Sequence, residues 1–302
     1  MGAILSKGAY FPTELTNEMI NLVRGKSSLA RLSGARPIPF NGETIFTFNL
    51  DSEVAIVAEN EAKSNGGGTI GTKSIQPIKV EYGMRVSDEF RFAAEEVQLE
   101  YLRAFAEGWA SKIARGVDIM AFHGLNPRTG QAATGTIGSN HFDAQVTANT
   151  VTFSAASADA NVEAAIAQVQ AGEHEVTGMA MAPAMRSALA ALKKGSNSNE
   201  PLFPELAWGA NPGVINGLPV DTNSTVSANT NTDRAIVGNF RDYFRWGYAL
   251  NVPIEVIEYG NPDNDATAGD LKGHNQIYLR GEAYIGWGIL VPAAFARVIA
   301  TT

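Results

Sequence analysis

The chain contains no cysteine among its 302 residues. It therefore has no disulfide, no thiolate nucleophile and no cysteine ligand for zinc. Histidine is scarce, and the four histidines (His123, His141, His174 and His274) show no i, i+4 pair of the kind that binds a metal on a helix. No serine stands in a Gly-x-Ser-x-Gly elbow. The sequence thus nominates no catalytic, cofactor-binding or metal-binding residue, and only a metal site built from histidines far apart in sequence stays open.

Long apolar runs are missing as well. The first seven residues, Met1 to Lys7, lack the apolar core of a signal peptide. No stretch approaches the roughly 20 apolar residues that span a bilayer. We expect a soluble protein that is made and used in a cytoplasm, without membrane contacts.

Charge is modest and unevenly distributed. Charged residues make up 18% of the chain and the formal net charge is −8, which argues against a general nucleic-acid binder. Residues 1–40 have the opposite balance, because Lys7, Arg24, Lys26, Arg31 and Arg36 outnumber Glu14 and Glu18. This basic segment is either a weak contact for a polyanion or an ordinary solvated terminus.

One glycine-rich segment comes close to a phosphate-binding loop. Residues 66–74 read GGGTIGTKS. A true loop has its lysine directly after the last glycine, and a helix begins there. Here Thr72 intervenes and a strand pattern follows, so we interpret the segment as a flexible hairpin tip. The carboxylate pairs Asp51/Glu53, Glu95/Glu96 and Asp263/Asp265 are typical of surfaces.

The most informative segment joins a strand to a long helix. Residues 78–86 alternate strictly, with Ile78, Val80, Tyr82, Met84 and Val86 on one face. Ser87 then precedes apolar residues that recur every three or four positions as far as Met120. A helix of this length is about 50 Å long at 1.5 Å per residue, which favours an elongated molecule.

The segments before this helix cannot bury their own apolar faces. Residues 14–24 predict a short helix in a terminal arm over residues 1–42. Residues 43–86 predict a two-stranded excursion with a polar, glycine-rich tip, in which the return strand starts near Ile75 and leads into the helix. Such a hairpin is marginal alone and becomes stable on a neighbouring surface.

A second α/β segment follows a Gly-, Thr- and Asn-rich loop. We predict a helix over 158–171, a buried strand over 177–182, and a second helix that ends at Lys193-Lys194-Gly195. Short strands are expected at 218–220, 235–237 and 254–258. The chain closes with a long strand over 277–290, whose inward face carries Ile277, Leu279, Ala283, Ile285, Trp287 and Ile289.

In this order the segments resemble a known family. The residues that carry the resemblance are Val86-Ser87-Asp88-Glu89-Phe90, Ile113 to Gly124, Met181-Ala182-Pro183, Gly217 to Val220, Ala235 to Phe240, Arg280 to Trp287 and Pro292 to Ala296. Together they resemble the major capsid proteins of tailed bacteriophages, whose Hong Kong 97-type fold is also found in encapsulins. The resemblance covers roughly residues 10–300.

The resemblance implies an α+β, Hong Kong 97-like capsid fold. It divides the chain into an N-terminal arm (1–42), an extended β-hairpin or E-loop (43–86), a peripheral domain with the spine helix (87–156), an axial domain (157–272) and a closing strand that returns to the peripheral domain (273–302). Candidate contacts between subunits are Glu59, Glu61, Lys63, Lys73, Arg24 and Arg31. Some members crosslink a hairpin lysine to an asparagine; Lys63 or Lys73, with Asn261 or Asn264, are the candidates, although a solvated lysine is the more ordinary outcome.

The implied function is that of a structural, non-enzymatic subunit without cofactors. It would assemble as hexamers and pentamers into an icosahedral shell in the bacterial cytoplasm and enclose double-stranded DNA with weak, non-specific contacts. About ten residues precede the arm helix, so a separate scaffolding protein, no scaffold, or a trimmed form is expected; a portal and decoration proteins are further partners. Two alternatives stay open: an encapsulin-like compartment, and a cytoplasmic α+β hydrolase with a deep polar pocket.

Overall fold

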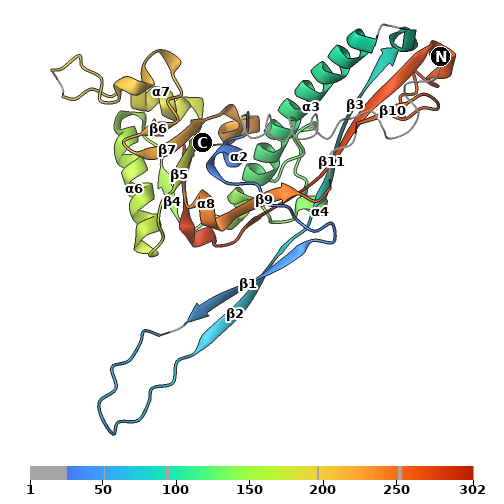
Figure 1. Cartoon of the computed structure of the whole chain (residues 1–302). Helices are drawn as coiled ribbons and strands as arrows, with labels where there is room; N and C mark the ends of the chain where they lie inside the picture. The colour runs from blue at the N-terminus through green and yellow to red at the C-terminus, as the bar shows by residue number, and fades with distance from the viewer. Residues whose placement is uncertain are drawn as a thin grey trace.

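The computed structural model describes residues 26–50, 52–92, 95–195, 197–230, 232–250 and 254–301. The molecule is elongated, with a compact lobe, a long narrow lobe and a hairpin that projects from the body (Figure 1). The predicted arm helix over 14–24 lies outside the described residues, as does Arg24. None of the helices in the described ranges combines the length and apolar character of a membrane span.

The long helix and the alternating strand form the narrow lobe. Strand β3 (Ile78–Ser87) pairs antiparallel with β11 (Gln276–Ile289), and β11 also pairs with β9 (Phe244–Tyr248) and β10 (Ile254–Ile257). Helix α3 (Glu95–His123) lies along this four-stranded sheet (Figure 1). Its 29 residues make it about 44 Å long.

The helix begins later than the sequence predicts. Instead of starting directly after Ser87, the chain first forms the 3-10 helix η1 (Asp88–Phe92), and α3 begins at Glu95. The Ser87 hydroxyl accepts a hydrogen bond from the Glu89 backbone N–H at 3.3 Å, so it caps this tight turn rather than an α-helix. The predicted inward face of β3 is confirmed, because Ile78, Val80, Met84 and Val86 pack against the core.

The compact lobe is a six-stranded sheet covered by two helices. Its strand order is β4-β12-β8-β5-β7-β6. The strands are β4 (Thr150–Thr152), β5 (Gly178–Met181), β6 (Val214–Ile215), β7 (Leu218–Thr222), β8 (Asp233–Gly238) and β12 (Phe295–Ile299). Helix α6 (Ala158–Ala171) has the predicted bounds, whereas α7 (Pro183–Ala191) ends before the predicted Lys193-Lys194-Gly195, because Leu192 is already extended.

Short elements connect these layers. The α-helices are α2 (Ser28–Leu32), α4 (Thr134–Ile137), α5 (Phe142–Gln145) and α8 (Phe240–Tyr243). The 3-10 helices are η2 (Ala155–Ser157), η3 (Pro204–Gly209), η4 (Ser224–Thr230), η5 (Lys272–His274) and η6 (Pro292–Ala294).

The hairpin is shorter than predicted and uses a different return strand. Strand β1 (Glu43–Leu50) pairs with β2 (Gly68–Ile75), so Ile75 ends the return strand instead of starting it. Pro77 has no backbone N–H to extend this ladder. After it the chain enters β3, whose partner is β11 in the body. Residues 52–67 form the distal loop without strand pairing.

The last strands of the chain connect both lobes. Strands β9 and β10 lie in the segment 157–272, which the resemblance assigns to an axial domain, but both pair with β11 in the narrow lobe. The closing segment itself divides, since β11 belongs to the four-stranded sheet and β12 pairs with β4 and β8 in the six-stranded sheet.

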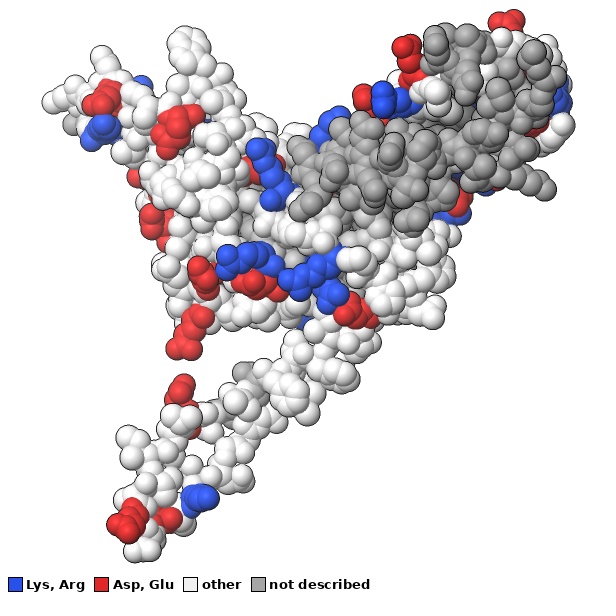
Figure 2. Space-filling view, viewed as in Figure 1, with Lys and Arg blue, Asp and Glu red and all other residues white. Residues whose placement is uncertain are grey.

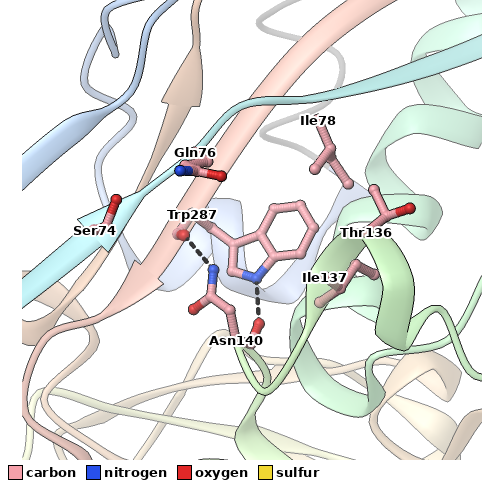
Figure 3. Close-up of a pocket in the computed structure, with 7 residues that line it drawn as sticks. All are labelled: Ser74, Gln76, Ile78, Thr136, Ile137, Asn140 and Trp287. Atoms are coloured by element: carbon pink, nitrogen blue, oxygen red, sulfur yellow. Dashed lines mark hydrogen bonds between the residues drawn. The ribbon is translucent and has the colours of Figure 1, made fainter.

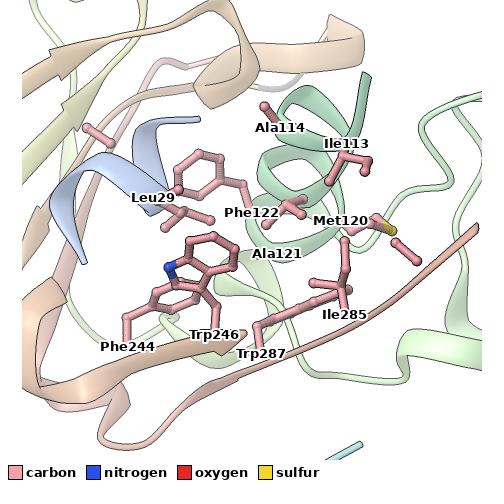
Figure 4. Close-up of a cluster of buried hydrophobic side chains, with 14 of the residues drawn as sticks. Leu29, Ile113, Ala114, Met120, Ala121, Phe122, Phe244, Trp246, Ile285 and Trp287 are labelled. Atoms are coloured by element: carbon pink, nitrogen blue, oxygen red, sulfur yellow. The ribbon is translucent and has the colours of Figure 1, made fainter. Parts of the chain in front are cut away.

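The main core lies where the two lobes meet. Figure 4 shows the C-terminal part of α3 packed against Trp246, Trp287, Phe244 and Leu29. Phe142, which is fully buried, contacts four other rings with centroid distances between 5.0 and 6.1 Å; these belong to Phe122, Phe240, Phe244 and Phe295. A second apolar cluster fills the space between the six-stranded sheet and helices α6 and α7.

We predict that Phe142→Ala lowers the free energy of unfolding by about 3–5 kcal/mol, because it leaves a cavity among four rings that cannot collapse together. Chemical denaturation of the isolated subunit measures the change. Phe92→Ala is the matched control, since Phe92 is 86% exposed and its loss should change stability by about 0.5 kcal/mol or less. Equal effects of the two substitutions would contradict this account of the core.

Candidate functional site

The projecting hairpin has one apolar face that no part of the described chain covers. Residues opposite one another in an antiparallel pair share a face, and the register places Phe48 opposite Ile70. Phe46, Phe48, Leu50 and Ile70 therefore lie on one side and are 67%, 72%, 75% and 63% exposed. Thr47 and Thr69 lie on the other side, which carries Gly71 and Lys73 along the ribbon and Ile45 and Ile75 nearer the body. The ribbon is thus amphipathic, and its apolar side faces solvent.

The distal loop continues this exposed apolar surface. Val54 and Ile56 are 94% and 99% exposed. The charged candidates Glu59, Glu61 and Lys63 also lie here and are exposed. Figure 2 shows that Lys, Asp and Glu gather near the distal end, whereas the part nearer the body is almost free of charge. Contiguous exposed apolar surface rimmed by polar residues is typical of a protein–protein contact.

The two other candidates among the described residues, Lys73 and Arg31, are bonded within the chain. Lys73, near the hairpin's root, donates a hydrogen bond to the Gln145 side chain at 3.4 Å. Arg31 on α2 forms an ion pair with Asp221 at 2.7 Å. The structure therefore brings Glu59, Glu61 and Lys63 together at the tip and places Lys73 and Arg31 elsewhere.

A small cavity lies beside the hairpin's root. Its volume is about 260 Å³, and it is lined by Ser74, Gln76, Ile78, Thr136, Ile137, Asn140 and Trp287 (Figure 3). The Trp287 indole N–H donates to the Asn140 carbonyl at 2.8 Å, and the Asn140 amide donates to the Trp287 carbonyl at 2.7 Å. None of the lining side chains titrates near neutral pH. The cavity therefore offers no general acid or base and differs from the deep polar pocket of the hydrolase alternative.

The junction of the lobes is held by a buried carboxylate that the sequence did not reveal. Asp118 on α3 is fully buried and accepts hydrogen bonds from the backbone N–H groups of Ser28 and Leu29, which begin helix α2. The hydroxyls of Ser27 and Thr225 donate to the same carboxylate. Asp118 thus caps α2 and connects it to α3 and η4. Burial raises the pKa of Asp118 to about 6, against the opposing effect of these hydrogen bonds.

A second buried network contains the one group of potential metal ligands found among the described residues. His123, Asp143 and Asp233 each offer a ligand atom within 4.8 Å of the others. The Arg297 guanidinium already donates to Asp143 at 2.7 Å and to Asp233 at 2.9 Å. The His123 ring contacts Asp143 at 3.0 Å and the Thr225 carbonyl at 2.9 Å. An added cation would have to compete with Arg297, so these residues fit a structural ion network better than a metal site.

Burial and the neighbouring charges together shift the pKa values in this network. Burial raises the pKa of Asp233 to about 7, and the neighbouring Asp143 adds to this effect while Arg297 opposes it. Burial works against the charged form of His123, but its hydrogen bond to Asp143 and the charge of that carboxylate raise the pKa of His123 above its usual value. The network joins α3, α5, β8 and β12, and so it fastens both lobes to each other.

At the far end of the narrow lobe, one arginine organises a long loop. Arg85 on β3 makes six hydrogen bonds across residues 261–276. Its partners are the side chains of Asn261, Asp263 and Gln276 and the carbonyls of Ala268 and Gly269. The hydrogen bond from Arg85 lowers the pKa of Asp263 to about 2. The suggested crosslinking residue Asn261 is thus bonded to Arg85 within the chain.

Sequence reasoning missed Asp118, Arg297 and Arg85 as organising residues. The alternation of β3 correctly placed Arg85 on the polar face, but nothing local indicated its partners about 180 residues later. Asp118 could have been suspected, because a carboxylate within an otherwise apolar helical stretch between Val117 and Ile119 must find donors when it is buried.

The model of a family described as the phage capsid family matches residues 7–298. A solved structure from Mycobacterium phage Ogopogo is 28% identical, with a TM-score of 0.76, and the match covers 100% of this chain and 97% of that one. A structure from Gordonia phage Cozz is 22% identical, with a TM-score of 0.74 and coverage of 100% and 92%.

A more distant similarity is to a structure titled "Capsid of empty GTA particle computed with C5 symmetry". It is 13% identical, with a TM-score of 0.64, and the match covers 100% of this chain and 94% of that one. At this identity the similarity concerns the fold. No curated protein sequence matches the chain.

Protonation of Asp118 predicts a specific pH dependence of stability. A carboxyl whose pKa rises on folding, here from 3.8 to about 6, stabilises the fold while it is protonated. This contribution is complete below pH 3.8 and is lost as the pH rises through 6. We expect the contribution of Asp118 to the free energy of unfolding to fall by up to about 3 kcal/mol as the pH rises from 4 to 7.

Asp118→Asn has no proton to lose, so its unfolding free energy lacks this component. Denaturant titrations from pH 4 to pH 7 should show wild type losing its advantage over the variant as the pH rises. Glu163→Gln, at an exposed position on α6, is the control and should follow wild type throughout. Parallel pH curves for wild type and Asp118→Asn would refute the assignment.

Arg85→Lys should loosen the loop although it keeps the charge, because an ammonium group cannot reproduce six bonds from a planar fork. We expect hydrogen exchange over residues 261–275 to accelerate about tenfold or more. The depressed pKa of Asp263 stabilises the wild-type loop above pH 3.8 and loses this effect as the pH falls through 2. Exchange in the variant should therefore be less sensitive to acid between pH 4 and pH 2.

Arg241→Lys is the matched control for Arg85→Lys. Arg241 contacts the exposed carboxylates of Glu175 and Asp242 at 3.8 and 3.5 Å. Its replacement should leave exchange in the loop unchanged. If both lysine variants behave like wild type, Arg85 does not organise the loop.

Proposed function

We propose, from the premise that this chain belongs to the phage capsid family, that its projecting hairpin interlocks neighbouring subunits of a shell. Family membership and the similar capsid structures make the chain a structural subunit of the capsid, which self-associates into the shell and resides in the virion. The fold is the α+β Hong Kong 97-like capsid fold that the sequence predicted.

The single observation that carries the interlock is the exposed apolar face of the hairpin. Phe46, Phe48 and Leu50 are each at least 67% exposed, in a ribbon whose two strands pair only with each other. A two-stranded ribbon in water is marginally stable at best. Burying this face on a second copy of the chain removes the apolar surface from water. Closed symmetry repeats the same contact at every subunit.

The assembly that follows is a closed icosahedral shell of hexamers and pentamers around double-stranded DNA. The formal net charge of −8 suits a wall that holds the genome without binding it tightly. We further propose a separate scaffolding protein, a portal and decoration proteins as partners, and assembly in the cytoplasm of a bacterial host. The proposed role is structural and not enzymatic.

The domain division of the family fits the two lobes with altered boundaries. We assign the peripheral domain to the narrow lobe, built from α3, β3, β9, β10 and β11. The axial domain is the six-stranded sheet with α6 and α7, to which β12 returns. The N-terminal arm covers residues 1–42, and the E-loop is the hairpin of β1, β2 and the distal loop.

Charged residues at the tip would orient the hairpin on its neighbour. Glu59, Glu61 and Lys63 are exposed there, where opposite charges on a second subunit can meet them. Lys73, Arg31 and Arg24 remain candidate contacts, although Lys73 and Arg31 would first have to exchange the partners they have within the chain.

The apolar face can be tested without shortening the hairpin. Deleting residues 59–72 should leave soluble subunits that form shells poorly, but it would also remove more than half of β2. We therefore predict that Phe46→Ser with Phe48→Ser leaves a folded subunit and abolishes most shell formation, as seen by negative-stain electron microscopy and size-exclusion chromatography. The loss follows from the apolar area that no longer leaves water on assembly.

Thr47→Ser with Thr69→Ser is the matched control on the opposite face of the same ribbon. This double substitution should assemble like wild type. Normal shells from the Phe46/Phe48 variant would remove the hairpin's apolar face from the assembly mechanism. A wild-type chain that stays a monomer or dimer under all assembly conditions would overturn the shell function itself.

A further inference from the structure

The root of the hairpin contains an unusually close fit between one side chain and two glycines. Ile75, the last residue of β2, is fully buried. A Cβ added at Gly288 of β11 would lie 2.7 Å from Ile75 Cγ1 and 3.0 Å from its Cδ1. A Cβ at Gly286 would lie 3.2 Å from Ile75 Cγ2. The Ile75 side chain thus occupies the space that side chains at these two positions would need.

The neighbouring chain segment closes this fit from the side. Ile38 is 2% exposed, and its Cδ1 would lie 3.1 Å from a Cβ at Gly286. The Ile38 backbone N–H donates to the Tyr248 carbonyl at 3.2 Å, which holds this segment against β9. Glu43 at the start of β1 adds an ion pair with Arg245 of β9 at 2.8 Å. Both strands of the hairpin are therefore fastened to the same sheet.

We propose that Ile75 and the two glycines, which we call the glycine socket, fix the direction in which the hairpin leaves the body. Ile75 is then a positioning residue for assembly, because it acts through the hairpin and not by touching the neighbouring subunit. This inference rests on the interlock proposed above. It adds that the direction is set in the single subunit, before any partner is met.

The direction is important because the hairpin is long, so a small tilt at its root displaces its far end by several ångströms. The far end of β2, Gly68, lies seven residues from Ile75, a distance of about 23 Å, so a tilt of about 10° at Ile75 moves it by about 4 Å. A displacement of that size separates apolar side chains that must meet within about 4 Å. Since interiors pack closely and overpacking displaces neighbours, one methyl group in the socket is enough to re-aim the hairpin.

The absence of cysteine makes the direction measurable. Thr69→Cys on β2 and Glu163→Cys on α6 introduce the only two thiols for spin labels. Doubly labelled chains are diluted in unlabelled protein, so that electron–electron distances report on single subunits whether or not shells form. Wild type should give one narrow distance distribution. Gly288→Ala should shift its mean by up to about 3 Å, because Thr69 lies six residues, or about 20 Å, from the pivot at Ile75, and Ile75→Ala should broaden the distribution.

Further variants keep the test informative if Gly288→Ala folds poorly. Gly286→Ala meets its neighbours at longer distances, 3.1 and 3.2 Å, and should shift the mean less. Ile75→Val loses one methyl group and should broaden the distribution less than Ile75→Ala. Gly273→Ala is the control, because nothing lies within 4 Å of a Cβ at that position; it should match wild type.

Two outcomes separate this inference from the proposed function. If the Gly288→Ala and Ile75→Ala distances equal those of wild type, the socket does not set the direction, even when wild type forms shells. If wild type forms no shells but the distances respond as expected, the shell function fails and the socket stands. When both hold, the shifted variants should give fewer closed particles than wild type and Gly273→Ala in electron micrographs.

Discussion

The constraint on which the structure depends is apolar surface that the single chain does not bury. The sequence builds a ribbon with phenylalanines on one side and projects it away from the body (Figure 1), so that Phe46 and Phe48 stay exposed. A monomeric protein would fold such a ribbon back or replace its phenylalanines with polar residues. In a shell, burial of this apolar surface on a neighbouring subunit would drive association. The surface that makes the hairpin marginal alone would then stabilise the assembly.

A projecting hairpin keeps its direction only if the two lobes of the body hold a fixed arrangement. Buried charged residues at the junction of the lobes help to hold it. Asp118 connects α2, α3 and η4, while Arg297 connects Asp143 and Asp233 on two further elements. Buried ion networks contribute little net stability compared with apolar packing, but each bond has a required geometry. At a junction between lobes that geometry is useful, because apolar contacts alone would permit the lobes to slide over one another.

The sequence predicts the features that depend on residues close together in the chain. It misses those that depend on partners far apart in the chain. Helix α6 has its predicted bounds because its periodicity and its stop at Gly172 are local signals. The inward face of β11 was predicted for the same reason. By contrast, β3 was interpreted as part of the hairpin, since the pattern of a strand does not name its partner, and β11 lies about 200 residues further on. The roles of Arg85 and Ile75 depend on such distant partners and left no local signal, whereas Asp118 left only the sign of a carboxylate in an apolar helical stretch, without naming its partners.

The glycines of β11 show how one strand can serve the core and the hairpin together. Ile285, Trp287 and Ile289 point into the main core, and the residues between them, Gly286 and Gly288, leave the opposite face without side chains. Glycine in a strand interior is destabilising by itself, so two of them in alternation need a compensating contact, which Ile75 supplies. Fixing the hairpin in this way removes most of its orientational freedom before assembly. Association then loses less entropy at each contact, which matters in a shell because every subunit meets that loss.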